Sequence, residues 1–219
     1  ATTEIYTLSL HGALPIYAQM HPSPSIHYSE WPLSTVGQGQ AEKLCGLLEP
    51  LGIEVMFSSP FLRCLQTVQS FADKAGIDIN VKDDLRERLV VQGIVDDFSK
   101  IWRRSWDDFN FAMPGCESSL DAQKRFAAAV EDILAGNKRE TIGISAHGNV
   151  IGLFLNHIRP AFRRDEAEAL TNPDVVRVLA DGRFVWDQEF HLPGLENIAT
   201  NHLETPFAGR VSREPGNQD

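Results

Sequence analysis

Two histidines, each followed by glycine, have the type and spacing to do chemistry in this chain. His11-Gly12 follows the strand-like run EIYTLSL, and His147-Gly148 follows the apolar run TIGISA. A neutral imidazole is a competent nucleophile near neutral pH, and a neighbouring glycine lets a substrate approach the backbone closely. One such pair is a weak signal. Two pairs at equivalent strand ends predict that both histidines face one pocket.

An arginine joins them in the stretch SSPFLRCLQT. Ser59 as N-cap and Pro60 at the first helical position predict a helix that ends at Gly76. Arg63 then lies in its first turn, where the amide groups favour an anion and a guanidinium can bind two phosphate oxygens. Ser58 and Ser59 are interpreted as helix caps rather than phosphate ligands. The predicted buried stripe leaves Arg63 out and consists of Phe61, Leu65, Val68, Ala72 and Ala75.

Alternating strands and helices must position these groups. Apolar periodicity predicts one mostly parallel sheet covered by helices on both faces, a three-layer α/β/α architecture. A hairpin is expected around Asp181-Gly182. The predicted strands are residues 4–10, 53–59, 77–81 and 141–146, and the predicted helices are 37–51, 60–75, 119–136 and 150–158.

A helical insertion at about residues 88–115 interrupts this alternation. Phe98, Trp102 and Phe109 fall on one face of it, which predicts core packing. The alternative interpretation is a lid that selects the leaving group of a substrate. The domain is expected to span residues 1–204, with a flexible polar tail at 205–219.

Composition excludes several function classes. A net charge of −10 argues against nucleic acid or an anionic membrane as a partner, because both require clustered cations. No stretch approaches the roughly 18 apolar residues of a membrane span. His21 and His27 have no further ligands at metal-binding spacing, and we interpret them as loop residues. An odd count of three cysteines predicts free thiols in a reducing compartment, with the cytoplasm as the expected location.

The ordered set of motifs resembles the histidine phosphatase superfamily, also called phosphoglycerate mutase-like. The motifs cover most of residues 3–155 and are HG (11–12), PLSTVGQGQA (32–41), SSPFLRCLQT (58–67), LRE (85–87), PGCES (114–118) and SAHGNVI (145–151). The resemblance implies the phosphoglycerate mutase-like fold and a phosphohistidine mechanism. It also implies a metal-independent phosphomonoester hydrolase that needs no cofactor and acts on a small phosphorylated substrate, with the oligomeric state left open.

The resemblance assigns roles to the catalytic residues. His11 attacks the phosphorus, and protonated His147 holds the phosphate oxygens together with Arg63. Glu87 is the general acid that protonates the leaving alkoxide and then the base that activates water. Glu117, in PGCES, is a rival for that acid. Gly12, Arg63 and Gly148 are the expected substrate-binding residues.

Leu10 departs from the family pattern, which has arginine immediately before the nucleophilic histidine. A charge about 4 Å from a phosphate oxygen is worth up to about 4 kcal/mol at an effective dielectric constant of 20. Its loss corresponds to roughly three decades of rate. One interpretation is therefore a catalytically impaired phosphate-binding or interaction protein with the same fold.

The second interpretation is that residues 9–16 are not those of the natural protein. ALPI followed by Tyr17 can be encoded by GCTCTTCCGATCT plus two bases, the end of a common sequencing adapter, and SLH fits the bases upstream. Arg63, Glu87 and His147 keep their motif settings, which favours an active ancestor with an altered segment. A phosphoglycerate mutase is a more distant alternative, because LVVQG follows LRER where those mutases have Tyr-Gly.

Overall fold

Six strands form the central sheet in the computed structural model, which describes residues 2–9, 27–137, 140–198 and 200–201. Their order is β3-β2-β4-β1-β6-β7, and β1, β4, β2 and β3 pair in parallel. Only β6 runs against the others among these six, so the mostly parallel sheet is confirmed. The strands are β1 (Thr3–Ser9), β2 (Val55–Ser58), β3 (Ile79–Val81), β4 (Ile142–Ala146), β6 (Asp174–Ala180) and β7 (Phe184–Asp187).

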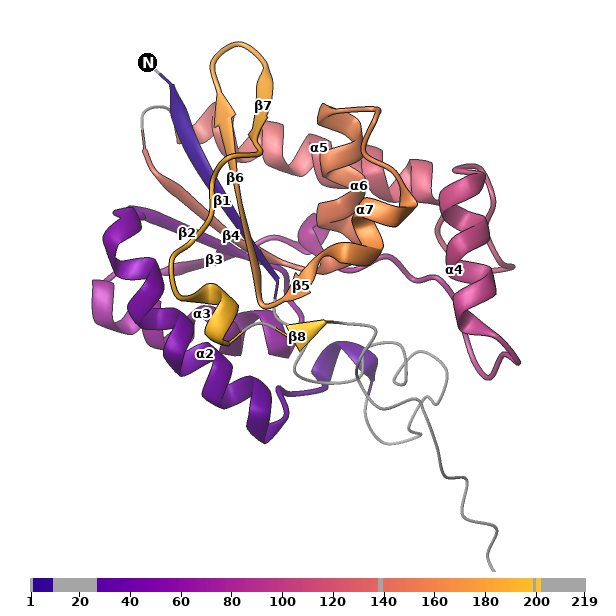
Figure 1. The fold of residues 1–219 in the computed structure, drawn as a ribbon, viewed down its shortest axis with the longest axis horizontal. Helices are drawn as coiled ribbons and strands as arrows, with labels where there is room; N and C mark the ends of the chain where they lie inside the picture. The colour runs from indigo at the N-terminus through magenta and orange to yellow at the C-terminus, as the bar shows by residue number, and fades with distance from the viewer. Residues whose placement is uncertain (1, 10–26, 138–139, 199, 202–219) are drawn as a thin grey trace, which may run out of the picture.

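Helices cover both faces of this sheet (Figure 1). One side carries α2 (Thr35–Leu48) and α3 (Leu62–Ala75). The other side carries α5 (Ser119–Gly136), α6 (Gly148–Ile158) and α7 (Arg164–Ala169), with α4 (Phe98–Asp107) beyond them. The shorter elements are the 3-10 turns η1 (Tyr28–Glu30), η2 (Glu49–Leu51), η3 (Asp83–Leu85) and η4 (Leu195–Asn197), and a small antiparallel pair of β5 (Thr171–Asn172) and β8 (Thr200–Asn201).

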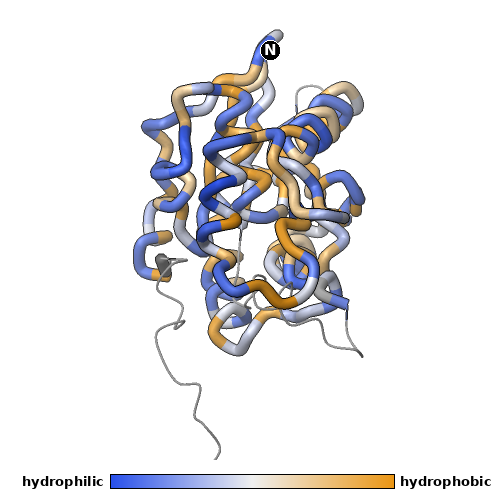
Figure 2. The backbone as a smooth tube through the Cα atoms, turned by 90° about the vertical axis from the view of Figure 1, so that its right-hand side faces the viewer, coloured by the Kyte–Doolittle hydropathy of each residue, from blue (hydrophilic) through white to orange (hydrophobic). Residues whose placement is uncertain are grey.

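The two-residue period of the strands builds a core on each side of the sheet. In β1, Ile5 belongs to the core under α5 and α6, whereas Tyr6 and Leu8 belong to the core under α2 and α3. The helices show the complementary pattern: hydrophobic and hydrophilic residues alternate along them (Figure 2). Helices α2, α3 and α5 therefore turn an apolar stripe to the core and a polar one to solvent.

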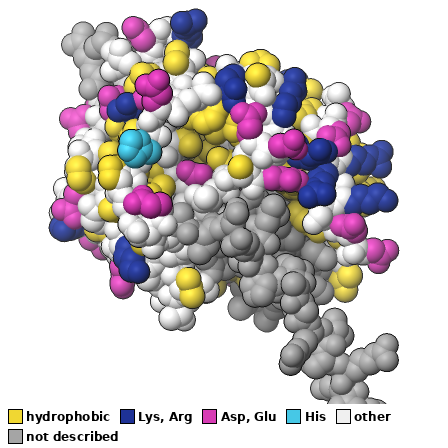
Figure 3. Space-filling model, viewed as in Figure 1, with side chains coloured by type: hydrophobic (Ala, Val, Ile, Leu, Met, Phe, Trp, Pro, Cys, Tyr) yellow, Lys and Arg dark blue, Asp and Glu magenta, His cyan; other side chains and the backbone are white. Residues whose placement is uncertain are grey.

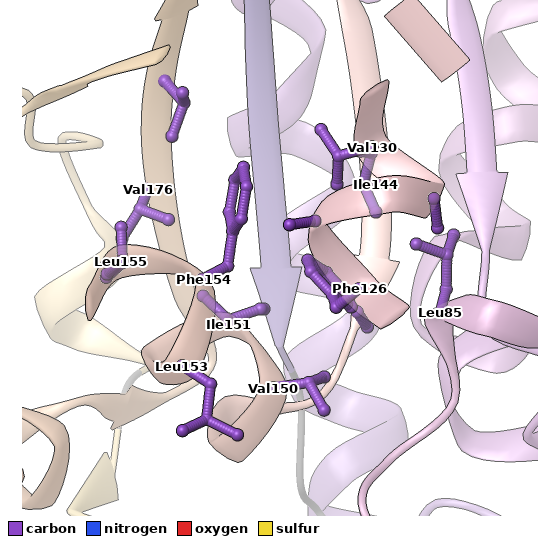
Figure 4. Packing of buried hydrophobic residues seen from close by; sticks show 14 of the residues in the cluster. Leu85, Phe126, Val130, Ile144, Val150, Ile151, Leu153, Phe154, Leu155 and Val176 are labelled. Atoms are coloured by element: carbon purple, nitrogen blue, oxygen red, sulfur yellow. The ribbon is translucent and has the colours of Figure 1, made fainter. Parts of the chain in front are cut away.

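Helix α6 is the exception, because it is buried on all sides. Every residue from Val150 to Asn156 is buried, as its continuous apolar sequence predicts. Phe154 packs against Phe126 of α5 with their ring centroids 5.6 Å apart. Figure 4 shows the α6 side chains packed around Phe126, Val130 and Ile144. This helix therefore holds the end of β4 in the core.

Among the described helices, none combines the length and apolar composition that a membrane crossing requires.

The insertion forms α4, and its packing face differs from the predicted one. Phe98, Trp102 and Phe109 are all half-buried, and of these three Trp102 and Phe109 pack against the core. The buried anchor is Trp106, whose ring lies 6.2 Å from that of Phe162 and beside Gly152 of α6. The two residues pack closely, since a Cβ at Gly152 would lie 3.4 Å from the Trp106 ring, at ordinary van der Waals distance.

Ion pairs also fasten α4 to α7. Arg103 Nε lies 2.9 Å from a Glu168 oxygen, and an Arg164 nitrogen lies 2.8 Å from an Asp107 oxygen. Figure 3, in the same view as Figure 1, shows cationic and anionic side chains gathered together on the right-hand side of the molecule, where Figure 1 places α4. The insertion is thus docked on the domain through both apolar and ionic contacts.

Helix α3 corrects two predictions. It begins at Leu62 with Phe61 as N-cap and no side-chain capping bond, so the predicted serine cap is wrong. Its buried residues are Arg63, Cys64, Thr67, Val68, Phe71 and Ala72, whereas Leu65 is half-buried and Ala75 is exposed. The predicted end at Gly76 is confirmed, with φ +68°.

The tail at 205–219 lies outside the described residues, and the domain boundary at 204 stays a prediction.

Candidate active site

The site lies where two neighbouring parallel strands end. β2 and β4 pair in parallel, with Ser58 beside Ser145, and Ser59 N–H donates to the Ser145 carbonyl at 2.9 Å. The chain then enters α3 after β2 and α6 after β4. Both helices therefore begin at the same edge of the sheet, where their N-terminal amides favour an anion.

His147 is the centre of the described site. It directly follows β4, and its side chain is completely buried. Its Nε2 lies 2.8 Å from Ser59 Oγ, and its Nδ1 lies 3.1 Å from an Arg63 terminal nitrogen. The Phe61 ring meets the imidazole edge-on, with centroids 4.9 Å apart. Arg63, predicted in the first turn of a helix, and His147, predicted at a strand end, are thus in direct contact.

The hydrogen bond from Arg63 fixes the protonation of His147 in this arrangement. A guanidinium carries only N–H donors, so Nδ1 must accept and bears no proton. A neutral imidazole then keeps its proton on Nε2, which donates to Ser59 Oγ. The protonated His147 predicted from the family mechanism requires Arg63 to leave Nδ1. A bound phosphate supplies a reason for that movement, because its oxygens are stronger acceptors for a guanidinium.

Arg63 is a buried cation, with an exposed fraction of 1%. Its guanidinium lies over the Phe61 ring, 4.8 Å from the centroid. The Arg63 carbonyl accepts a hydrogen bond from Thr67 Oγ1 at 2.7 Å one turn later. The first turn of α3 is thus held in shape below the charge. The predicted stripe, which left Arg63 off the buried face of the helix, is therefore wrong at this position.

Cys64 also contacts His147, which sequence analysis did not foresee. Its sulfur lies 3.4 Å from His147 Nε2 and donates to the Ala146 carbonyl at 3.3 Å. Burial raises the pKa of this thiol to about 12. A neutral thiol therefore fills the space beside the imidazole. The apolar spacing of α3 gave no signal for this contact, because it depends on how α3 packs against β4.

Glu87 follows η3 and is buried, although its charged run DDLRER is typical of a solvated face. One carboxylate oxygen, Oε1, accepts the backbone N–H of Arg88 at 2.8 Å. Burial raises the pKa of the Glu87 carboxyl, while that N–H and then the Arg63 and Arg88 charges lower it. The raised pKa favours the protonated form, which a general acid needs. The influence of Arg63 also places Glu87 within electrostatic range of the Arg63–His147 pair.

The rival acid Glu117 is engaged elsewhere. Arg125 binds both of its carboxylate oxygens, with Nε to Oε1 at 2.8 Å and Nη2 to Oε2 at 2.8 Å. Arg125 also donates to the carbonyls of Asp84 and Arg86, at 2.6 and 3.1 Å. This bidentate pair supports the backbone that leads to Glu87. It favours Glu87 over Glu117 as the acid.

Other predicted site residues divide into two groups. Gly148 is the first residue of α6, directly after His147. His11, Gly12 and Leu10 lie outside the described residues. Ser59 was predicted to cap a helix but instead contacts His147, because α3 begins three residues after it. Across the parts of the chain that the structure covers, no three His, Cys, Asp or Glu side chains are grouped to hold a metal ion.

Comparison with known proteins gives one family match and a set of solved structures with a similar fold. A family model described as histidine phosphatase superfamily (branch 1) matches residues 27–181. No curated protein matches the chain. A mycobacterial glucosyl-3-phosphoglycerate phosphatase, solved with VO3, superposes with a TM-score of 0.69 at 18% identity, covering 84% of this chain and 96% of its own.

Two further solved structures are similar. YhfR of Bacillus stearothermophilus has a TM-score of 0.69 at 20% identity, and the match covers 85% of this chain and 96% of that one. A mutant phosphoserine phosphatase from Entamoeba histolytica, in complex with phosphoserine, has a TM-score of 0.65 at 17% identity, with coverage of 84% and 94%. At these identities the likeness shows the fold alone.

Proposed function

Because the chain belongs to the histidine phosphatase superfamily, we propose that it is a phosphomonoester hydrolase that acts through a phosphohistidine intermediate. The observation that carries the proposal is the buried contact between Arg63 and His147, with Glu87 within range of the same charge. A buried guanidinium in the first turn of a helix, beside an imidazole at the start of a second helix, is suited to bind an anion. The bound anion is the phosphoryl group of the substrate.

The proposed reaction has two steps. A nitrogen of His11 forms a bond to phosphorus while the bond from phosphorus to the leaving oxygen breaks, and Glu87 donates its proton to that oxygen. Water then attacks the phosphorus, Glu87 takes a proton from the water, and the bond to His11 breaks to release phosphate. Arg63 and His147 stabilise the charge on the other phosphoryl oxygens in both steps. Arg63 is cationic throughout, and His147 becomes cationic when the bound phosphate draws Arg63 away from Nδ1 and that nitrogen takes up a proton. These charges stabilise the phosphoryl group, so the proposal includes no metal ion or cofactor.

The proposed substrate is a small phosphorylated metabolite. Two of the similar solved structures carry names of phosphatases, one for glucosyl-3-phosphoglycerate and one for phosphoserine. The net charge of −10 supports a small molecule over a nucleic acid or an anionic membrane. Three free cysteines support the cytoplasm as the proposed compartment.

A second candidate function rests on Leu10. Without the arginine expected at that position, the protein would bind phosphorylated ligands through Arg63 and His147 but turn them over poorly. Phosphate binding alone is then the retained function. The two candidates differ in whether a covalent phosphoenzyme forms.

A labelled phosphomonoester separates the two candidates. The hydrolase is expected to give an acid-labile phosphoenzyme, and His147→Ala is expected to reduce turnover strongly. Leu10→Arg is expected to raise turnover by about three decades, from the charge estimate for that position. If the chain carries no label and His147→Ala leaves turnover unchanged, hydrolysis through a phosphohistidine at this site is excluded. Sequencing a fresh amplicon across codons 8 to 18 tests whether residues 9–16 belong to the natural protein.

A further inference from the structure

Arg88 is a completely buried arginine to which the proposed reaction gives no role. It follows Glu87 directly in the sequence, at the start of the insertion. Burial lowers the pKa of its guanidinium to about 10, so the group stays charged at neutral pH. Placing a charge in the interior is expensive unless it is held by polar partners. Its partners therefore indicate what the charge is for.

Two serines from different helices hold the guanidinium. Nη2 donates to Ser105 Oγ of α4 at 2.8 Å, and Nη1 donates to Ser119 Oγ at the start of α5. Both hydroxyls then donate to carbonyls of α4: Ser105 to that of Trp102 at 2.7 Å, and Ser119 to that of Ser105 at 2.5 Å. The side chain of Arg88 is thus anchored where α4 meets α5.

The backbone of the same residue holds the general acid. Arg88 N–H donates to Glu87 Oε1 at 2.8 Å, so the carboxylate depends on the position of that N–H. The flanking backbone is fixed as well. Arg125 binds the carbonyls of Asp84 and Arg86 before Glu87, and Glu117 N–H donates to the Leu89 carbonyl after it, at 3.0 Å. Movement of Arg88 would therefore displace the carboxyl directly.

We propose that Arg88 is the positioning residue for the general acid: its guanidinium, anchored to Ser105 and Ser119, fixes the backbone N–H that binds the Glu87 carboxylate. The inference rests on the proposed function for its catalytic meaning. It also gives the insertion a second role, because α4 then supports the acid from behind. The charged groups that face Glu87 are Arg88 itself, Arg63 from α3 and Arg125 from α5, with the neutral thiol of Cys64 nearby.

The sharpest kinetic test varies the leaving group. An alkyl phosphate needs protonation of its leaving oxygen, whereas p-nitrophenolate leaves well without it, and a general acid contributes roughly 10²–10⁴-fold. Arg88→Met is expected to lower kcat for the alkyl phosphate at least about tenfold more than kcat for p-nitrophenyl phosphate. Arg88→Lys keeps the charge and is expected to restore part of the loss. Equal losses on both substrates would overturn the inference, because a merely structural defect affects both alike.

The matched control is Arg103→Met, which removes the exposed ion pair between α4 and Glu168 but leaves Ser105 in place. It is expected to leave the ratio of the two rates unchanged. If Arg88→Met does not fold, Ser119→Ala removes one anchor only and is expected to show the same preferential loss. A changed ratio in Arg103→Met would mean that general loosening of α4 causes the effect.

A second readout does not depend on turnover. Selective ¹³C labelling of glutamate carboxyls, assigned by comparison with Glu87→Gln, follows the titration of Glu87 by NMR. The midpoint is expected to lie at higher pH in Arg88→Met and near the wild-type value in Arg88→Lys, because a nearby positive charge favours the carboxylate. An unchanged midpoint in Arg88→Met would overturn the positioning role. Absence of turnover in every variant, the wild type included, would instead count against the proposed function.

Discussion

Replacing Arg63 by methionine tests the site most directly. The substitution keeps a long side chain in the buried position but removes the charge and the hydrogen bond to His147 Nδ1. A unit charge about 4 Å from a phosphate oxygen contributes about 4 kcal/mol at an effective dielectric constant of 20. If that energy acts mainly in the transition state, kcat/KM falls by roughly three decades. Because the phosphoryl charge is present in the substrate as well, binding of inorganic phosphate is also expected to weaken.

The assay is the steady-state hydrolysis of p-nitrophenyl phosphate, with inorganic phosphate as a competitive inhibitor. Arg63→Lys is the matched variant, since an ammonium keeps the charge but cannot bind two oxygens in a planar fork. It is expected to lie between the wild type and Arg63→Met. Circular dichroism and a urea melt show whether each variant is folded. If folded Arg63→Met keeps kcat/KM within about tenfold of the wild type, the reasoning that places the phosphate at Arg63 is refuted.

Three further predictions concern stability and reactivity. Burial raises the pKa of the Glu87 carboxyl above its ordinary 4.5, so the native protein loses stability as pH rises past that value. The glutamine of Glu87→Gln does not titrate, so the urea midpoint of this variant is expected to rise relative to that of the wild type as the pH goes from acidic to neutral. A difference between the two midpoints that stays constant with pH would contradict this. Iodoacetamide is expected to spare Cys64, whose pKa is about 12, until the protein unfolds, while the two half-buried cysteines react; mass spectrometry locates the label. Gly76→Ala is expected to cost about 1–2 kcal/mol, because φ is +68° and a Cβ there meets nothing within 4 Å. Gly39 also has open space around it but an ordinary φ, so Gly39→Ala is expected to stabilise the protein slightly in the same urea melts. An equal loss of stability from both substitutions would be inconsistent with a backbone effect.

Sequence alone could place the main elements and two of the site residues. The rule that ligands bind at the carboxyl ends of parallel strands placed His147 at a pocket, and helix-start signals placed Arg63 in a first turn suited to an anion. The structure joins the two side chains at 3.1 Å. Glu87 was found only through the family motif, since its charged neighbours indicate a solvated face. The structure buries it because Arg88 and Arg125 hold the backbone on both sides.

The interior contacts of the site could not be predicted in the same way. Helical spacing gives the apolar stripe of an isolated helix, but the face of α3 that is buried also contains Arg63 and Thr67, because it packs on β4 as well as on the apolar core. Ser59 appeared to be a helix cap because position and residue type fit that role. Because α3 starts only at Leu62, the Ser59 hydroxyl accepts the N–H of Phe61 ahead of the helix, at 3.3 Å, and also contacts His147. Such contacts depend on which strands are neighbours, which local patterns do not encode.

In the strand order β2-β4-β1, the residues proposed to bind phosphate and the proposed nucleophile follow different strands. The named contacts of His147 with Ser59, Arg63 and Cys64 all arise from the junctions after β2 and β4. His11 follows β1 in the sequence, and β1 pairs with β4 on the side away from β2. An anion-binding site built from these two strand junctions does not depend on the segment that follows β1. Under the proposed function, a related protein that loses the nucleophile would therefore still bind phosphate esters through Arg63 and His147. The same two junctions could also serve an enzyme that uses a different nucleophile.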